Sequence, residues 1–78
     1  PLAAGLTDDT DYKTRLQECV QGRGMSTPVY EEIGRDGPAH DPLFTMRVVV
    51  DGASLAEGRG HSKQSAQQAA AKTALAAL

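Results

Sequence analysis

The chain has 78 residues, of which 40% are hydrophobic, and it carries a formal net charge of −2 with one cysteine and no tryptophan. A domain of this size buries only about 60% of the surface that its unfolded chain exposes, which disfavours a pocket that engulfs a substrate and favours a binding module. A single cysteine excludes an internal disulfide, and no stretch approaches the roughly 20 apolar residues of a membrane span, so a cytoplasmic protein without membrane contact is expected.

The first ten residues, PLAAGLTDDT, combine Pro, Gly, Thr and Asp without a sustained hydrophobic period. They lack the basic start and apolar centre of a signal peptide. Their composition is typical of a flexible lead-in or of the end of an interdomain linker. We therefore expect one domain over residues 11–78, with residues 1–10 outside it, and interpret the chain as a piece of a longer protein.

A helix is predicted over residues 11–22. Asp11 is a suitable N-cap residue, apolar side chains then recur at helical spacing, and Gly22 marks the end of the pattern. Cys19 shares the apolar spacing, so we expect it to be buried as a small hydrophobic residue rather than to act as a reactive thiol. On the opposite face a polar stripe recurs at i, i+3, i+4 and i+7, made of Thr14, Gln17, Glu18 and Gln21. This stripe is either solvated surface or a contact surface.

Between residues 27 and 57 the hydrophobic period changes from about 3.6 to about 2, which predicts three short strands. The first strand, PVYEEIGRD, is expected at a sheet edge because Pro28 cannot donate a hydrogen bond to a neighbouring strand. The second strand, LFTMRVVVD, alternates apolar side chains on one face, namely Phe44, Met46, Val48 and Val50. The pair Asp51-Gly52 is typical of a hairpin turn, after which residues 53–57 are expected to return as the third strand.

A second helix is predicted from Ser62 or Lys63 to Leu78, with Ser62 as its N-cap residue. Its many alanines favour helix formation. Its narrow apolar face consists of Ala66, Ala69, Ala70, Thr73, Ala74, Ala77 and Leu78. The order of elements predicts an α+β fold, a two-layer α-β-β-β-α sandwich in which both helices cover one face of a three-stranded antiparallel sheet.

The segment GRGHSKQ, residues 58–64, is interpreted as a loop that opens the second helix. It does not match a Walker loop, because both the spacing and the final hydroxyl are wrong, and Lys63 stands where a dinucleotide fingerprint requires glycine. Neither the spacing of metal ligands nor a hydrolytic triad is recognisable in the chain. A helix start with basic side chains suits an anion such as phosphate, and an ordinary capped and solvated helix end is the alternative.

Several segments together resemble a double-stranded-RNA-binding domain: KTRLQE, PVYEE, GPAH, the strand FTMRV and GRGHSKQSAQQAAA. The resemblance covers residues 10–78 in the family's order, and KTRLQE makes the chain most similar to the carboxy-terminal domain of bacterial ribonuclease III. It implies the α-β-β-β-α fold, shape-selective binding of double-stranded RNA and three contact regions.

The first two implied regions would each enter a minor groove of the RNA. One is the polar stripe of the first helix, where the hydroxyl, amide and carboxylate of Thr14, Gln17 and Glu18 suit ribose 2′-hydroxyls and base edges. The other is the loop of Gly37, Pro38, Ala39 and His40. Its glycine and proline would shape the turn, and its histidine would enter the groove. A solvated helix face and an ordinary turn are the respective alternatives.

The third implied region would lie over the phosphates of the intervening major groove. It consists of Arg59, His61, Ser62, Lys63, Gln64 and Gln67. Here the chain departs from the family, whose motif commonly reads Lys-Lys-x-Ala-Lys, because only Lys63 remains. A glutamine donates hydrogen bonds to phosphate but releases no counterion, so a lower affinity and a shallower salt dependence are expected.

The resemblance also implies a place in a larger enzyme. The chain would be the substrate-binding part of an endonuclease that processes structured RNA such as ribosomal precursors. The catalytic domain would precede it, dimerise and use magnesium ions, whereas this chain alone is expected to be a monomer without catalytic residues, metal or cofactor. A different interpretation is a domain of the same fold that binds a protein partner and has little affinity for RNA.

Overall fold

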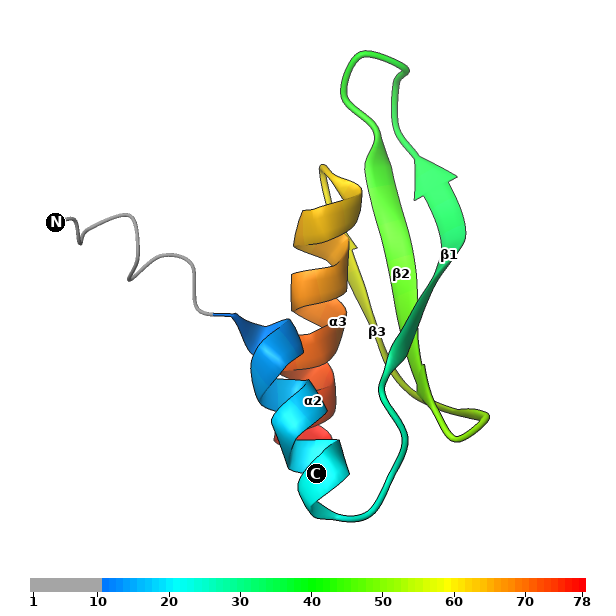
Figure 1. Ribbon diagram of the computed structural model, residues 1–78. Coiled ribbons are helices and arrows are strands. Elements are labelled where there is room, and N and C mark those ends of the chain that lie inside the picture. Colours follow the sequence, from blue (N-terminus) through cyan, green and yellow to red (C-terminus); the bar gives the residue numbers. More distant parts are fainter. Residues whose placement is uncertain (1–10) are drawn as a thin grey trace, which may run out of the picture.

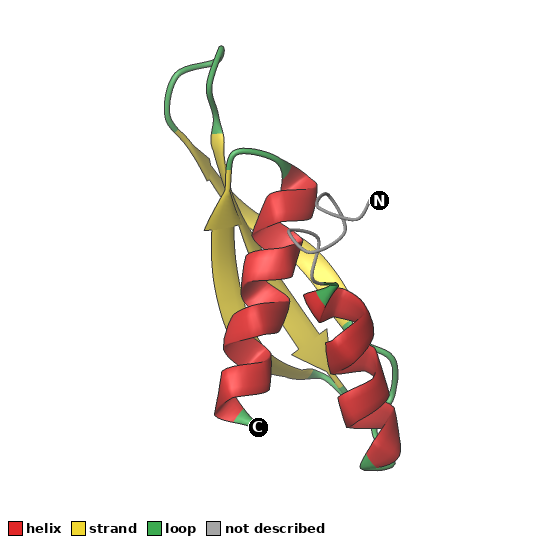
Figure 2. Ribbon diagram, turned by 90° about the vertical axis from the view of Figure 1, so that its left-hand side faces the viewer, coloured by secondary structure: helices red, strands yellow, loops and turns green. Residues whose placement is uncertain are grey.

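The computed structural model describes residues 11–78. These residues form α2 (Tyr12–Gly22), β1 (Val29–Asp36), β2 (Leu43–Val50), β3 (Ala53–Gly60) and α3 (Lys63–Ala77). The strands form one antiparallel sheet in the order β1-β2-β3, and both helices lie on the same face of it (Figure 1). Figure 2 shows the two layers from the side of the helices. The predicted α-β-β-β-α sandwich is confirmed, and β1 is an edge strand as expected. The predicted lead-in at residues 1–10 lies outside the described residues.

Both helices begin at the predicted N-cap residues. The Oδ1 atom of Asp11 accepts a hydrogen bond from the backbone amide of Thr14 at 3.0 Å. The Oγ atom of Ser62 accepts one from the backbone amide of Ser65, also at 3.0 Å. Each cap satisfies one of the amides that the first turn of a helix leaves without a carbonyl partner, which explains why the helices start where they do.

The hydrophobic core lies between the sheet and the two helices. Its fully buried members come from α2, β2 and α3, and they are Leu16, Val20, Val48, Val50, Ala70, Ala71 and Ala74. On β2 the predicted alternation is confirmed for Met46, Val48 and Val50, which are all buried. Phe44 is only half-buried, near the end of the strand, where the guanidinium of Arg35 lies 4.8 Å from its ring centroid. Cys19 is also half-buried, so the expectation of a buried cysteine is wrong.

The buried face of α3 differs from the predicted one. Ala66, Ala70 and Ala74 are buried as expected, but Ala71 is buried as well. Three residues of the predicted face are exposed instead, namely Thr73, Ala77 and Leu78, and Ala69 is half-buried. The reason is that α3 packs against α2 as well as against the sheet. Two neighbours on different sides turn the buried surface away from the single stripe that the sequence pattern predicts.

The third strand is longer than predicted, because β3 continues past Glu57 to Gly60. The first part of the expected loop over residues 58–64 is therefore strand. Gly58 lies so close to α3 that an added Cβ atom would be 2.1 Å from the backbone nitrogen of Ala70. Gly58 thus allows β3 and α3 to approach each other closely, rather than shaping a loop around a ligand.

Candidate nucleic-acid interface

The polar stripe of α2 faces outward. Thr14, Gln17 and Glu18 are all exposed. The hydroxyl of Thr14 donates to the second carboxylate oxygen of Asp11 at 2.5 Å. The two hydrogen bonds from Thr14 are the main reason why the pKa of Asp11 is lowered from its ordinary value of 3.8. Asp11 is thus held as a carboxylate at the start of the stripe, and Gln17 and Glu18 present their polar groups to solvent.

The loop between β1 and β2 projects beyond the amino-terminal end of α3, as Figure 1 shows. The backbone amide of Asp41 donates to the carbonyl of Pro38 at 3.0 Å, which closes a tight turn with Ala39 and His40 at its tip. Gly37 has a φ of 85°, and an added Cβ atom would lie 3.0 Å from the carbonyl oxygen of Asp41. Glycine is therefore required at this position, and the exposed tip presents His40 to solvent.

The start of α3 lies at the same end of the molecule as this loop, and a close contact between two polar side chains joins them. The Nδ1 atom of His61 is 3.0 Å from Oδ1 of Asp41. His61, Ser62, Lys63 and Gln64 are all exposed, and Ser62 holds its position through the N-cap. The second and third predicted regions are thereby brought together, with exposed polar side chains next to the positive end of a helix.

Arg59 does not join that group. Gly58 and Gly60, its neighbours in β3, both face α3. Because successive residues of a strand point to opposite faces, Arg59 lies on the face of the sheet away from the helices, where it is paired in register with Thr45. Its predicted role at the start of α3 therefore lacks support from the geometry.

Lys63 has an acidic neighbour in the free protein. Its Nζ atom is 3.3 Å from Oε1 of Glu32 on β1, and Oε2 of the same carboxylate is 3.6 Å from Arg35. The lysine and arginine side chains are mostly exposed and Glu32 is 32% exposed, so water screens both pairs and makes them weak. The charge that the sequence assigns to phosphate binding is thus partly neutralised by the protein itself.

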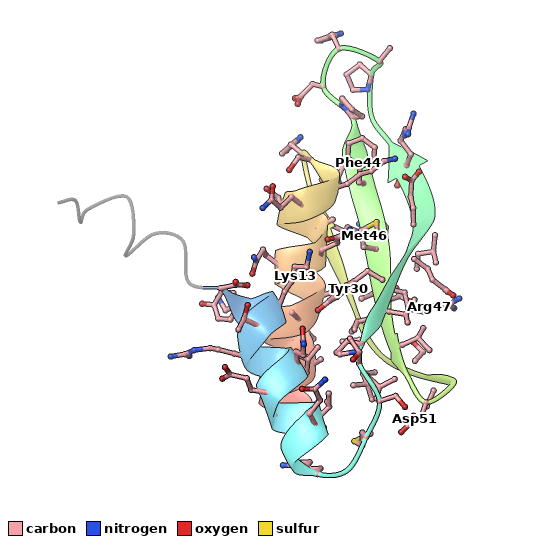
Figure 3. All side chains as sticks on the ribbon, in the orientation of Figure 1. Lys13, Tyr30, Phe44, Met46, Arg47 and Asp51 are labelled. Atoms are coloured by element: carbon pink, nitrogen blue, oxygen red, sulfur yellow. The ribbon has the colours of Figure 1, made fainter. Side chains whose placement is uncertain are left out.

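Lys13 makes polar contacts that the sequence pattern does not predict. Its Nζ atom donates to Oε1 of Gln67 at 2.6 Å and lies 5.3 Å from the ring centroid of Tyr30. Figure 3 shows the Lys13 and Tyr30 side chains pointing toward one another from α2 and β1. Burial raises the pKa of Tyr30 to about 12, and its hydroxyl is buried without a partner among the described residues. The one available signal was the i, i+4 spacing of Lys13 and Gln17, which places both on one side of α2.

The charge of the domain is balanced. Asp8 and Asp9 precede the described part, and residues 11–78 contain as many Asp and Glu as Lys and Arg residues. Within these residues no group of three or more His, Cys, Asp or Glu side chains is placed to hold a metal ion. No helix in this range is long and apolar enough to cross a membrane. Any attraction to a polyanion must therefore come from where the charges lie rather than from their sum.

Comparison with known proteins adds three findings. Residues 12–78 match the family model described as the double-stranded RNA binding motif. The chain is 55% identical over 67 residues to Ribonuclease 3 of Syntrophobacter fumaroxidans, which covers 86% of this chain and 28% of that protein. It is 47% identical over 79 residues to Ribonuclease 3 of Geobacter metallireducens, covering 97% of this chain and 32% of that protein. The chain thus spans about a third or less of these relatives.

Solved structures agree with the fold. A structure of Arabidopsis HYL1, reported with its molecular implications for miRNA processing, superposes with a TM-score of 0.72 at 38% identity. The match covers 86% of this chain and 94% of that one. A solution structure of both double-stranded-RNA-binding domains of DRB4 superposes with a TM-score of 0.66 at 34% identity, covering 88% of this chain and 44% of that one.

Proposed function

Because the chain belongs to the double-stranded RNA binding motif family, we propose that it binds double-stranded RNA by shape, across two minor grooves and the phosphates between them. The observation that carries the proposal is a chain of contacts joining three exposed polar segments. The loop after β1 is tied to the start of α3 by Asp41 and His61. One turn into α3, Gln67 is tied to α2 by Lys13. These contacts add to the shared core of α2, α3 and the sheet, which sets the separations of the three segments. Defined separations are what reading a duplex by its groove spacing requires.

Each segment has a distinct chemical task in this proposal. On α2, the carboxylate of Glu18 accepts a hydrogen bond from a ribose 2′-hydroxyl, a group that DNA lacks, and Gln17 pairs with groove edges. At the loop tip His40 enters the next minor groove. At the start of α3, Lys63 meets phosphates across a major groove that is too deep and narrow for side chains to read. Sequence-independent binding follows, because none of these groups reads a base pattern in the major groove.

The relatives suggest the larger setting. The chain spans only 28% and 32% of the two Ribonuclease 3 proteins that it matches. The proposal therefore includes a parent protein whose other part is a dimeric, magnesium-dependent nuclease in the cytoplasm, acting on structured RNA such as ribosomal precursors. In that setting this domain supplies affinity for the substrate and performs no cleavage.

A second candidate function is binding to a protein. It is favoured by the balanced charge of residues 11–78 and by the pairing of Lys63 with Glu32, both of which reduce the attraction to a polyanion. In this case the exposed stripe of α2 would contact a partner protein. The affinity for RNA would be weak and equal to that for DNA.

A titration separates the two candidates. At low salt, we expect an RNA duplex of about 20 base pairs, longer than the roughly 16 that the motif spans, to bind much more tightly than DNA of the same sequence. Equal affinity for both duplexes would refute the RNA proposal. Adding magnesium to the purified chain and duplex RNA tests the non-catalytic role, since cleavage by the chain alone would contradict it.

A further inference from the structure

Lys13 occupies a position between two of the segments assigned to RNA. It stands one helical turn before Gln17 on α2, and residues four apart lie on the same side of a helix. Its ammonium reaches across to α3, where it donates to Oε1 of Gln67 at 2.6 Å. Gln67 in turn lies one turn after Lys63, on the same side of α3. The Lys13 ammonium therefore lies on a path from the groove-facing stripe of α2 to the phosphate-facing start of α3.

The charge of Lys13 is less compensated than that of Lys63. Between residues 11 and 78, no carboxylate lies within ion-pairing distance of the Lys13 ammonium, whereas Lys63 has Glu32 at 3.3 Å. The contacts of Lys13 are a neutral amide oxygen and the face of the Tyr30 ring. An ammonium has three donors, so the bond to Gln67 leaves donor capacity for a further acceptor.

The contacts of Lys13 also fix where its charge is held. A lysine side chain has four flexible carbons, and holding it in one place costs conformational entropy. Here the hydrogen bond to Gln67 and the position over the Tyr30 ring restrict it before any ligand arrives. A phosphate that meets the ammonium at this point does not have to order the side chain, and such preorganisation favours affinity.

We propose that Lys13 is a phosphate-binding residue of this domain, which contacts the RNA backbone between the minor groove read by Gln17 and the phosphates met by Lys63. The proposal rests on the proposed function. Together, Lys13 and Gln67 form one composite site, in which α2 supplies the charge and α3 supplies an amide that orients it. The competing explanation is a purely structural link, in which the hydrogen bond only ties α2 to α3.

Salt dependence separates these explanations. Each phosphate contact made by a cation contributes about 0.9 to the slope of log affinity against log salt concentration. We expect Lys13→Gln to reduce that slope by about one unit and Lys13→Arg to retain it. A structural link alone predicts loss of stability in Lys13→Gln with the slope unchanged, which would overturn the proposal.

Lys72→Gln is the matched control. Lys72 also lies near an aromatic ring, 5.7 Å from the centroid of Tyr12, and the substitution removes the same charge. Lys72 stands nine residues after Lys63, about 13 Å farther along the helix axis. The salt slope of Lys72→Gln is expected to equal that of the unchanged protein. Equal slope losses in Lys13→Gln and Lys72→Gln would indicate an effect of net charge and would overturn the proposal.

Two further measurements guard the test against a variant that fails to fold. Lys13→Arg, which keeps the charge, serves as the matched variant, and its slope is compared only after circular dichroism shows that each variant is folded. In the unchanged protein, an amine-reactive reagent followed by mass spectrometry is expected to modify Lys13 more slowly when duplex RNA is bound, with Lys72 unaffected. Unprotected Lys13 in an RNA complex would overturn this inference alone, whereas failure of the unchanged protein to prefer RNA over DNA would overturn the proposed function with it.

Discussion

The Nζ atom of Lys63 lies 3.3 Å from Oε1 of Glu32, so the lysine at the start of α3 is paired with a carboxylate of the edge strand β1. In the proposed complex, a phosphate that approaches Lys63 competes with this carboxylate for the charge of the ammonium. The Lys63 side chain is mostly exposed and Glu32 is partly exposed, and such a solvent-screened pair is weak. We therefore expect the carboxylate of Glu32 to lower the affinity of the domain for a polyanion.

Lys63→Ala is expected to weaken the binding of duplex RNA of every sequence, because it removes a phosphate contact. It should also reduce the salt slope by about one unit. Glu32→Gln is the paired variant and should raise the affinity, because Lys63 is then free of its carboxylate. Titrations at several salt concentrations measure both effects, and an unchanged slope in Lys63→Ala would exclude Lys63 as a phosphate contact.

Gln17→Ala is expected to reduce RNA affinity by several-fold, equivalent to the roughly 1 kcal/mol of a typical hydrogen bond. Gln17 is exposed, so the melting temperature and the circular dichroism spectrum should not change. Titration with duplex RNA beside thermal unfolding checks this. The opposite pattern, an unfolded variant with full binding per folded molecule, would show that Gln17 serves the fold rather than the RNA.

Gly58→Ala is expected to destabilise the fold by about 1–3 kcal/mol or more, as overpacking does in a dense core. The added Cβ atom would lie 2.1 Å from the backbone of Ala70, which has no side-chain freedom with which to yield. Gly22→Ala is the control, since nothing lies within 4 Å of a Cβ atom there. Urea unfolding measures the free energy of unfolding of both variants. Equal values would contradict the close contact between β3 and α3.

Because Asp11 caps α2, we expect the free energy of unfolding to depend on pH. The hydrogen bonds from Thr14 lower the pKa of Asp11 below its ordinary value of 3.8 in the folded protein. The contribution of Asp11 is therefore present above pH 3.8 and is lost as the pH falls through the lowered pKa. Asp11→Asn keeps a capping side chain that does not titrate. Unfolding free energies measured between about pH 5 and pH 2 should fall less steeply in Asp11→Asn, and parallel curves would rule out this linkage.

The elements that sequence predicts well here depend on local chemistry. Asp11 and Ser62 cap the helices through the amides three residues ahead, and Asp51-Gly52 forms its turn with positive φ at both residues. These features need only neighbouring residues, so their patterns are sufficient. The order of elements follows from them, and with it the fold.

The features that sequence missed depend on residues far apart in the chain. Gly58 pairs with β2 and lies directly against α3, and the contact between Lys13 and Gln67 joins positions separated by 54 residues. Proximity in the sequence predicts that Arg59 lies at the start of α3, but strand alternation places it on the other face of the sheet. Such relationships appear only when the packing of α2, α3 and the sheet is known.

The most direct test of the central claim follows backbone amide signals by NMR while duplex RNA of about 20 base pairs is added to the isotope-labelled domain. The account predicts that shifts concentrate in three segments: the stripe with Thr14, Gln17 and Glu18, the loop of residues 37–40, and the start of α3 at residues 61–67. The face of the sheet away from the helices, where Arg47 pairs with Glu31, should remain unchanged. Shifts concentrated on that face, with the three segments unperturbed, would contradict the account.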